Sequence, residues 1–174
     1  SCLPPQAMAG VLGEGDFTFV DLVRAALNGD LTADALAATP GLAIHQNNQV
    51  IETTPRPRIK DLDILPFPAR DLLDIHKHTP MITSRGCPYR CNFCFTARFW
   101  NTARFHSAEY VANEIEMLVK DYGVRFISFY DDLFIAKKDR IEDLILLLGK
   151  KGLLNQIDFS CNARANLVDD ALIS

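Results

Sequence analysis

The feature that most constrains the fold is an alternation of short apolar strands and amphipathic helices in the second half of the chain. Apolar runs predict strands over residues 81–84, 124–130 and 157–161. Apolar residues at helical spacing predict helices over 107–122 and 139–151, between these strands. Buried strands that alternate with helices are typical of parallel β/α units. The pattern therefore predicts an α/β fold, either a twisted sheet or a barrel.

End signals support the same helices. Ser107 is placed to cap the first helix, and Gly123 to end it. Asp139 and Glu142 form a possible capping box for the second helix. Asp169 stands where it could cap a third helix.

The first 80 residues have a different character. A helix is predicted from a cap at Asp16 to about residue 28, and a hairpin is predicted from strands 42–45 and 49–52 around Asn47-Asn48. Residues up to about 12 show no clear pattern. The proline-rich stretch 54–70 reads as an extended linker laid over a surface. We therefore predict a linker region at 1–80 and the β/α units at 81–174.

Three of the five cysteines stand close together, at Cys87, Cys91 and Cys94. Thiolates at such spacing can share one metal centre, and iron–sulfur clusters use cysteine ligands, usually four of them. Three ligands would leave one iron with an open coordination position. Cys2 and Cys161 are isolated and read as incidental thiols. The odd count and the clustering favour metal binding in a reducing cytosol over a disulfide framework.

Charge and hydropathy exclude other classes of function. The formal net charge is −4, which gives no electrostatic case for binding nucleic acid. No apolar run approaches the roughly 18 residues of a membrane-spanning helix, and the N-terminus lacks a signal-peptide pattern. The local basic residues, which can compensate an anionic cluster, surround the cysteines: Arg85, Arg90, Arg98 and Arg104.

Polar or metal-binding residues follow each of the three predicted strands. The cysteines follow the first strand, Tyr130-Asp131-Asp132 end the second, and Asn162-Ala163-Arg164 end the third. Chemistry in parallel β/α barrels lies at the carboxyl ends of the strands. All three groups are therefore expected at the same rim.

The cysteine spacing, with an aromatic residue before the last cysteine, resembles the signature of the radical S-adenosylmethionine (radical SAM) superfamily. The run from Thr83 to Cys94, and Phe129 to Phe134, are similar to the subgroup whose radical domain follows a cobalamin-binding domain. Upstream, Gly13 to Asp16 and the run 61–70 resemble the interdomain segment of that subgroup.

This resemblance implies a ligand set and a cofactor. Cys87, Cys91 and Cys94 would bind a [4Fe–4S] cluster, whose open iron would bind S-adenosylmethionine and cleave it to a 5′-deoxyadenosyl radical. Phe93 would place its backbone against the adenine.

The resemblance also implies cofactor contacts from the later strands. Tyr130, Asp131 and Asp132 stand where many relatives carry a Gly-Gly-Glu-like segment that contacts the amino group of S-adenosylmethionine. Arg164 could meet the carboxylate of the cofactor or a substrate anion. Asp131-Asp132 could equally begin a turn.

The fold implied by the resemblance is a TIM-like partial barrel of about six β/α units, of which this chain would hold about the first three. The chain is therefore expected to be a fragment of a cytoplasmic enzyme. Residues 74–79 imitate the cobalamin-binding signature but end in Thr79 instead of glycine, so cobalamin is implied only for a longer parent protein. An electron donor such as flavodoxin or ferredoxin and a small-molecule substrate of unknown identity are implied as partners.

Two other hypotheses remain open at the level of sequence. The first is a non-catalytic zinc module that uses the three cysteines and His106, since tetrahedral zinc accepts three cysteines and one histidine. The second is an inactive, truncated remnant, whose exposed sheet edge after the third strand would favour aggregation.

Overall fold

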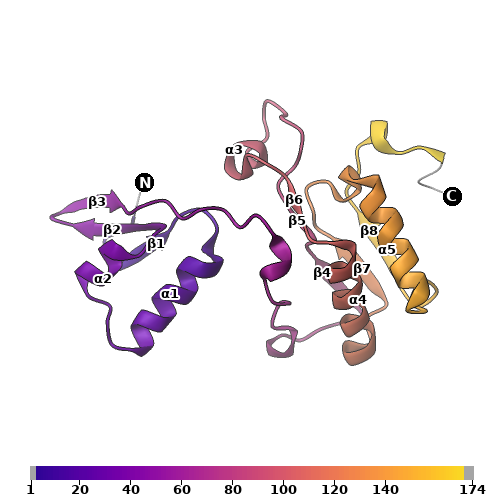
Figure 1. The fold of residues 1–174 in the computed structure, drawn as a ribbon, viewed down its shortest axis with the longest axis horizontal. Helices are drawn as coiled ribbons and strands as arrows, with labels where there is room; N and C mark the ends of the chain where they lie inside the picture. Colours follow the sequence, from indigo (N-terminus) through magenta and orange to yellow (C-terminus); the bar gives the residue numbers. More distant parts are fainter. Residues whose placement is uncertain (1–2, 171–174) are drawn as a thin grey trace. The chain divides into compact units, whose positions relative to one another are not determined.

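The computed structural model describes residues 3–170, which fall into two compact units that divide between Ile59 and Lys60 (Figure 1). The first unit is a three-stranded antiparallel sheet with two helices. Its strands β1 (Ala9–Val11), β2 (Leu42–Gln46) and β3 (Gln49–Glu52) lie in that order, and its helices are α1 (Gly15–Leu27) and α2 (Ala33–Ala38).

The predicted hairpin is confirmed. Gln46 pairs with Gln49, and both turn residues, Asn47 and Asn48, have positive φ values, 50° and 63°. Asparagine tolerates this left-handed backbone better than most residues, and a two-residue turn of this hand matches the twist of the strands. The turn chemistry therefore sets the register of β2 against β3.

Other features of the first unit differ from the prediction. Asp16 lies inside the first turn of α1, and the N-cap is Glu14, whose side chain makes no capping hydrogen bond. A carboxylate in the first turn still interacts favourably with the helix dipole. Strand β1 and helix α2 were not predicted. Helix α2 is capped by Thr32, whose hydroxyl accepts a hydrogen bond from the amide of Ala35 at 3.2 Å.

The second unit begins with an irregular segment. Between Lys60 and Lys77 the structure has only two short 3₁₀ turns, η1 (Leu62–Ile64) and η2 (Arg70–Leu72), which agrees with the predicted absence of helix and strand. The segment is not merely laid over a surface, however, because Leu62 is fully buried and Arg70 is 8% exposed. The division of the chain at residues 80 and 81 stays a prediction.

Three parallel strands confirm the β/α prediction. They are β4 (His78–Met81), β7 (Phe126–Phe129) and β8 (Asp158–Cys161), with β7 in the middle. The first strand begins three residues earlier than predicted and includes Pro80, which an edge strand tolerates. The middle strand is shorter than predicted at both ends. Within residues 3–170 the sheet is open, as expected for part of a barrel.

Two helices connect these strands. Helix α4 (Ala108–Tyr122) begins at the predicted cap, where the Ser107 hydroxyl accepts from the amide of Tyr110 at 3.0 Å, and ends at Gly123 in a left-handed conformation. Helix α5 (Lys138–Lys150) begins after Lys137 without a side-chain cap, so the predicted capping box is wrong. Asp139 lies in its first turn, where a carboxylate favours the positive end of the helix dipole.

Helices α4 and α5 lie side by side over the sheet (Figure 1). The core between them contains Ile115, Leu118, Ile127, Leu144 and Leu148, all at most 4% exposed. The core is aliphatic because each helix repeats apolar residues every three or four positions. Of the third predicted helix, the part beyond Asp170 lies outside the described residues. No helix in the described part of the chain is long and apolar enough to cross a membrane.

Candidate metal centre

The three cysteines lie on one long loop at the carboxyl ends of the parallel strands. The loop leaves β5 (Ser84–Arg85), carries helix α3 (Thr96–Trp100) and returns through β6 (Arg104–Phe105). Strands β5 and β6 pair antiparallel and form the neck of the loop. Figure 1 shows α3 and the segment that follows β8 at the same end of this unit, as the shared strand direction predicts.

Gly86 is the residue that lets the loop turn away from its neck. Its φ is +89°, and an added Cβ would lie 2.8 Å from the Cβ of Trp100 and 2.9 Å from the carbonyl oxygen of Thr102. Only glycine fits such a backbone at such a distance. Trp100 in turn contacts the guanidinium groups of Arg85 and Arg104, whose Cζ atoms are 5.8 and 5.5 Å from the centre of its ring.

The thiols of the loop are free and accessible to different extents. Cys91 is exposed, Cys87 and Cys94 are half-buried, and the amide of Cys94 donates to the carbonyl of Cys91 at 3.0 Å. Their chemistry fits iron, since thiolates are the usual ligands of iron–sulfur clusters. Within residues 3–170, no three His, Cys, Asp or Glu side chains already lie together as a metal site. A metal shared by the three thiols would require them to come closer together.

His106, the fourth ligand of the zinc hypothesis, is held elsewhere. It is 8% exposed, its Nδ1 lies 3.1 Å from Oδ1 of Asp63, and its ring stacks on Tyr110 at 3.9 Å. Burial lowers the pKa of His106, although the nearby Asp63 acts to raise it. Burial acts to raise the pKa of Asp63, but hydrogen bonds from Ser107 and His106 outweigh that effect, so the pKa of Asp63 is lowered. Such a histidine anchors the segment before β4 to helix α4. The structure therefore does not favour the zinc hypothesis.

All but one of the residues predicted to contact the cofactor are exposed to solvent. Phe93 is 94% exposed on the cysteine loop, and Tyr130 is 66% exposed directly after β7. Asp132 is also exposed, and its Oδ1 accepts a hydrogen bond from the hydroxyl of Thr96 at 3.2 Å. Thr96 begins helix α3, two residues after Cys94. This contact joins the end of β7 to the cysteine loop.

Asp131 points the other way, into the protein. It is 1% exposed, and its carboxylate accepts hydrogen bonds from the amide and hydroxyl of Thr83, both at 3.0 Å, and from the hydroxyl of Ser84. Burial raises its pKa despite these hydrogen bonds. The acidic side chain that faces the rim is therefore Asp132, while Asp131 binds the backbone that leads into the cysteine loop.

Arg140 of helix α5 completes this buried cluster. Its Nε donates to the carbonyl of His106 at 2.9 Å, and its Nη2 donates to the carbonyl and hydroxyl of Thr83. The side chain is 7% exposed, and burial lowers its pKa against the opposing charges of Asp131 and Asp63. Sequence reasoning did not single out Thr83 or Arg140, because neither residue carries a motif.

Arg164 reaches the cysteine loop from the far strand. Its Cζ lies 3.9 Å from the centre of the Tyr89 ring, and its Nε donates to Asn166 at 3.3 Å. Tyr89 stands between Cys87 and Cys91 and packs partly against the core. Sequence reasoning missed Tyr89, although its place between two predicted ligands could have drawn attention to it. The ends of β4, β7 and β8 thus meet at one rim, where Asn162 also donates to the carbonyl of Asp131 at 3.3 Å.

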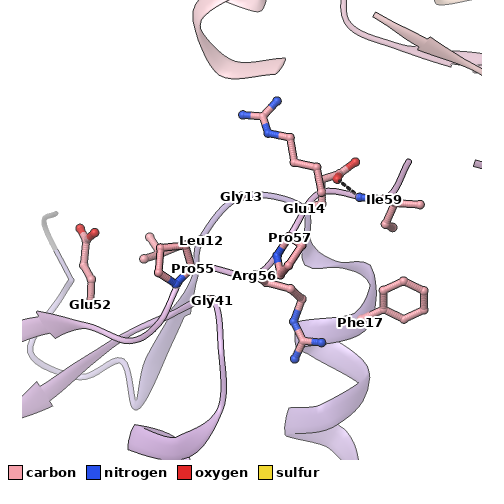
Figure 2. Close-up of a pocket in the computed structure, with 11 residues that line it drawn as sticks. Leu12, Gly13, Glu14, Phe17, Gly41, Glu52, Pro55, Arg56, Pro57 and Ile59 are labelled. Atoms are coloured by element: carbon pink, nitrogen blue, oxygen red, sulfur yellow. Dashed lines mark hydrogen bonds between the residues drawn. The ribbon is translucent and has the colours of Figure 1, made fainter. Parts of the chain in front are cut away.

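A separate pocket of about 270 Å³ lies within the first unit (Figure 2). Its wall includes Glu14, whose carboxylate accepts a hydrogen bond from the amide of Ile59 at 2.9 Å, and Arg56, which pairs with Asp21. The charges in the wall are largely occupied by these contacts. Part of the proline-rich segment lines the pocket, and none of the predicted site residues does.

Most of the second unit matches the model of a known protein family. The model of the Radical SAM superfamily matches residues 81–173. An uncharacterised methyltransferase of Pyrococcus horikoshii is 35% identical over 170 residues, which cover 93% of this chain and 36% of that protein. Anaerobic magnesium-protoporphyrin IX monomethyl ester cyclase of Synechocystis is 32% identical over 74% of this chain and 26% of its own length. The chain thus spans about a quarter to a third of these relatives.

Solved structures agree with this comparison. The cobalamin-dependent S-adenosylmethionine radical enzyme OxsB superposes with a TM-score of 0.69 and 26% identity, over 91% of this chain and 23% of that one. TsrM of Kitasatospora setae, a radical S-adenosylmethionine methyltransferase, superposes with a TM-score of 0.64 over 87% of this chain and 32% of its own, and at 18% identity it supports the fold alone.

Proposed function

Because this chain belongs to the radical SAM superfamily, we propose that Cys87, Cys91 and Cys94 hold a [4Fe–4S] cluster that binds S-adenosylmethionine. The observation that carries the proposal is the position of three free thiols on one loop, at the carboxyl edge of a parallel sheet. When bound, the cluster supplies the electron that cleaves S-adenosylmethionine to a 5′-deoxyadenosyl radical, which abstracts hydrogen from the substrate.

The task of the chain itself is to hold and shape the site. Gly86 turns the loop away from its neck, and the pairing of β5 with β6 keeps the two ends of the loop together. Arg85 and Arg104, which both contact Trp100, add positive charge near an anionic cluster.

We also assign cofactor contacts to the residues at the rim. The exposed Phe93 is free to place its backbone against the adenine, and Tyr130 with Asp132 presents polar groups toward the amino group of S-adenosylmethionine. Asp131 belongs to the same segment, but its carboxylate is buried and acts through the hydrogen bond that it accepts from the amide of Thr83. Arg164, held over Tyr89, is positioned to meet the carboxylate, because a stacked guanidinium keeps its N–H groups in its own plane.

The class of reaction is inferred from the relatives. Their names include methyltransferases and a cyclase, so methyl transfer or oxidative cyclisation is the proposed outcome in the complete protein. OxsB is named as cobalamin-dependent, and we propose cobalamin as a cofactor of the longer parent protein only. We further propose a cytoplasmic enzyme with a small-molecule substrate and a reductant such as flavodoxin or ferredoxin.

The test is anaerobic reconstitution of the chain with iron and sulfide. The proposal predicts about four iron and four sulfide per chain. It also predicts an EPR signal of the reduced cluster that shifts when S-adenosylmethionine is added. Cys94→Ala should lose the cluster, whereas Cys161→Ala, which removes another free cysteine at the end of β8, should retain it. Tight zinc in place of iron, or a signal indifferent to S-adenosylmethionine, would contradict the proposal.

A further inference from the structure

The neck of the cysteine loop is held by a buried polar relay. The hydroxyl of Thr83 accepts a hydrogen bond from Nη2 of Arg140 and donates one to Oδ1 of Asp131 at 3.0 Å. All three side chains are at most 7% exposed. The relay joins helix α5 to the end of β7 through a residue that lies between β4 and β5.

Arg140 contacts both ends of the loop at once. Thr83 stands four residues before Cys87, on the entry to the loop, and Arg140 donates to its carbonyl at 3.2 Å. His106 stands directly after β6, on the exit, and Arg140 donates to its carbonyl at 2.9 Å. The amide of His106 also donates to the carbonyl of Thr83 at 2.9 Å. The guanidinium of Arg140 thus bridges the backbone at Thr83 and at His106, the two ends of the loop that carries the cysteines.

Stability alone does not account for this arrangement. Burial of charged groups carries a large desolvation penalty, and apolar replacements of buried ion networks are often neutral or stabilising. Nη1 of Arg140 is also buried without a hydrogen-bond partner. What the network does provide is geometry, because a planar guanidinium donates in fixed directions to acceptors on two residues, Thr83 and His106.

We propose that Arg140 and Asp131 are positioning residues that clamp the neck of the cysteine loop through Thr83 and thereby set where the three thiols lie. Neither residue needs to touch the cluster or the cofactor. The consequence at the cluster rests on the proposed function, whereas the clamp itself can be tested on the metal-free chain.

Four variants of the chain separate the clamp from general stability. Thr83→Val keeps the shape of the side chain but removes the relay, and Thr83→Ser keeps the hydroxyl. Arg140→Lys keeps the charge but loses the two-armed geometry. Arg70→Lys is the matched control, since it makes the same charge-preserving change at an equally buried arginine whose hydrogen bonds go to Glu114 and Pro80, outside residues 83–106.

The first measurement is amide hydrogen exchange of the metal-free chain, with thermal unfolding to confirm that each variant folds. Thr83→Val and Arg140→Lys should speed exchange within residues 84–106 about tenfold, as expected for loss of a buried hydrogen bond. Thr83→Ser should leave it near the wild-type rate. Arg70→Lys should not open this loop. Unchanged exchange in Thr83→Val, or equal opening in Arg70→Lys, would overturn the proposal.

The second measurement is the reconstituted cluster. Thr83→Val should hold less iron per chain and show an altered EPR shift on addition of S-adenosylmethionine, and Thr83→Ser should restore both. If the wild-type chain binds no cluster, the proposed function fails while the exchange data still decide the clamp. If the wild-type chain binds the cluster and Thr83→Val matches it in exchange, iron content and EPR, only the clamp is refuted.

Discussion

The guanidinium of Arg164 lies over the ring of Tyr89, 3.9 Å from its centre, and so joins the end of β8 to the cysteine loop. The stack orients a cation at the rim where the proposed cofactor binds. Tyr89 is partly buried and packs against the core, which restricts the movement of its ring. Arg164 is therefore preorganised, although it lies in an exposed segment.

Loss of this cation should weaken cofactor binding more than cluster binding. Arg164→Gln is expected to raise the Kd of S-adenosylmethionine about tenfold, because hydrogen bonds to charged groups contribute about 1.5–3 kcal/mol. Iron content should stay unchanged. Tyr89→Phe, which keeps the ring, should bind like the wild type, and Tyr89→Leu should bind more weakly. Titration of the EPR shift with S-adenosylmethionine measures each Kd, and equal values for Arg164→Gln and wild type would refute the assignment.

Gly86→Ala should disrupt the cysteine loop. The new Cβ would lie within 3 Å of Trp100 and Thr102, on a backbone with φ of +89°. Gly123→Ala is the control, because Gly123 also has positive φ, +67°, but nothing within 4 Å of the added atom. We expect Gly123→Ala to cost about 1 kcal/mol of stability and to keep the cluster. Gly86→Ala should lose iron in reconstitution, and full iron occupancy in this variant would contradict the expectation.

The buried pair of Arg70 and Glu114 should show a pH-dependent contribution to stability. Their side chains are 9% and 2% exposed and lie 2.7 Å apart. Arg70→Met leaves a buried carboxylate without its partner and should cost about 3–5 kcal/mol near neutral pH. Burial already raises the pKa of Glu114 above 4.5, even with Arg70 present.

The sign of this pH dependence follows from the raised pKa. A native state that binds the proton more tightly than the unfolded chain loses stability as pH rises through the window above 4.5. Removal of Arg70 should raise the pKa of Glu114 further, because Arg70 favours the charged carboxylate. Glu114 is then protonated in the native state at a higher pH, so the loss of stability in Arg70→Met should shrink as the pH is lowered toward 5. Urea unfolding at several pH values measures this, and a constant or growing loss would contradict it.

Tyr110 should titrate at unusually high pH. Burial, followed by the nearby charges of Glu114 and Asp63, raises its pKa to about 12, and its hydroxyl donates to the carbonyl of Pro66 at 3.1 Å. The unfolded chain releases this proton near pH 10, so the contribution of Tyr110 to stability should be lost as the pH rises from about 10 to about 12. Tyrosinate absorbance should show a late phase that Tyr110→Phe removes. A titration of the variant that matches wild type would contradict this.

Local patterns predicted the elements whose causes are local. Ser107 and Gly123 are separated only by the helix that they bound, and both were found where the prediction placed them. The turn at Asn47-Asn48 likewise depends on the backbone preferences of two residues. The predicted cap of the second helix failed. Asp139 could form a capping box, but the helix begins one residue before it, at Lys138.

The strand–helix alternation predicted the parallel sheet, and the cysteine spacing, through its resemblance to a known signature, predicted the family and the loop proposed to hold the metal. Each of these signals lies in neighbouring residues, so the sequence by itself was enough. Only the tertiary structure decided the direction of Asp131, the partners of Arg140 and the meeting of Arg164 with Tyr89. These contacts join residues 34–75 positions apart, and they form only when parallel strands bring their carboxyl ends to one edge. Arg140, which belongs to no sequence motif, therefore gains its proposed role only from the contacts that the fold brings together.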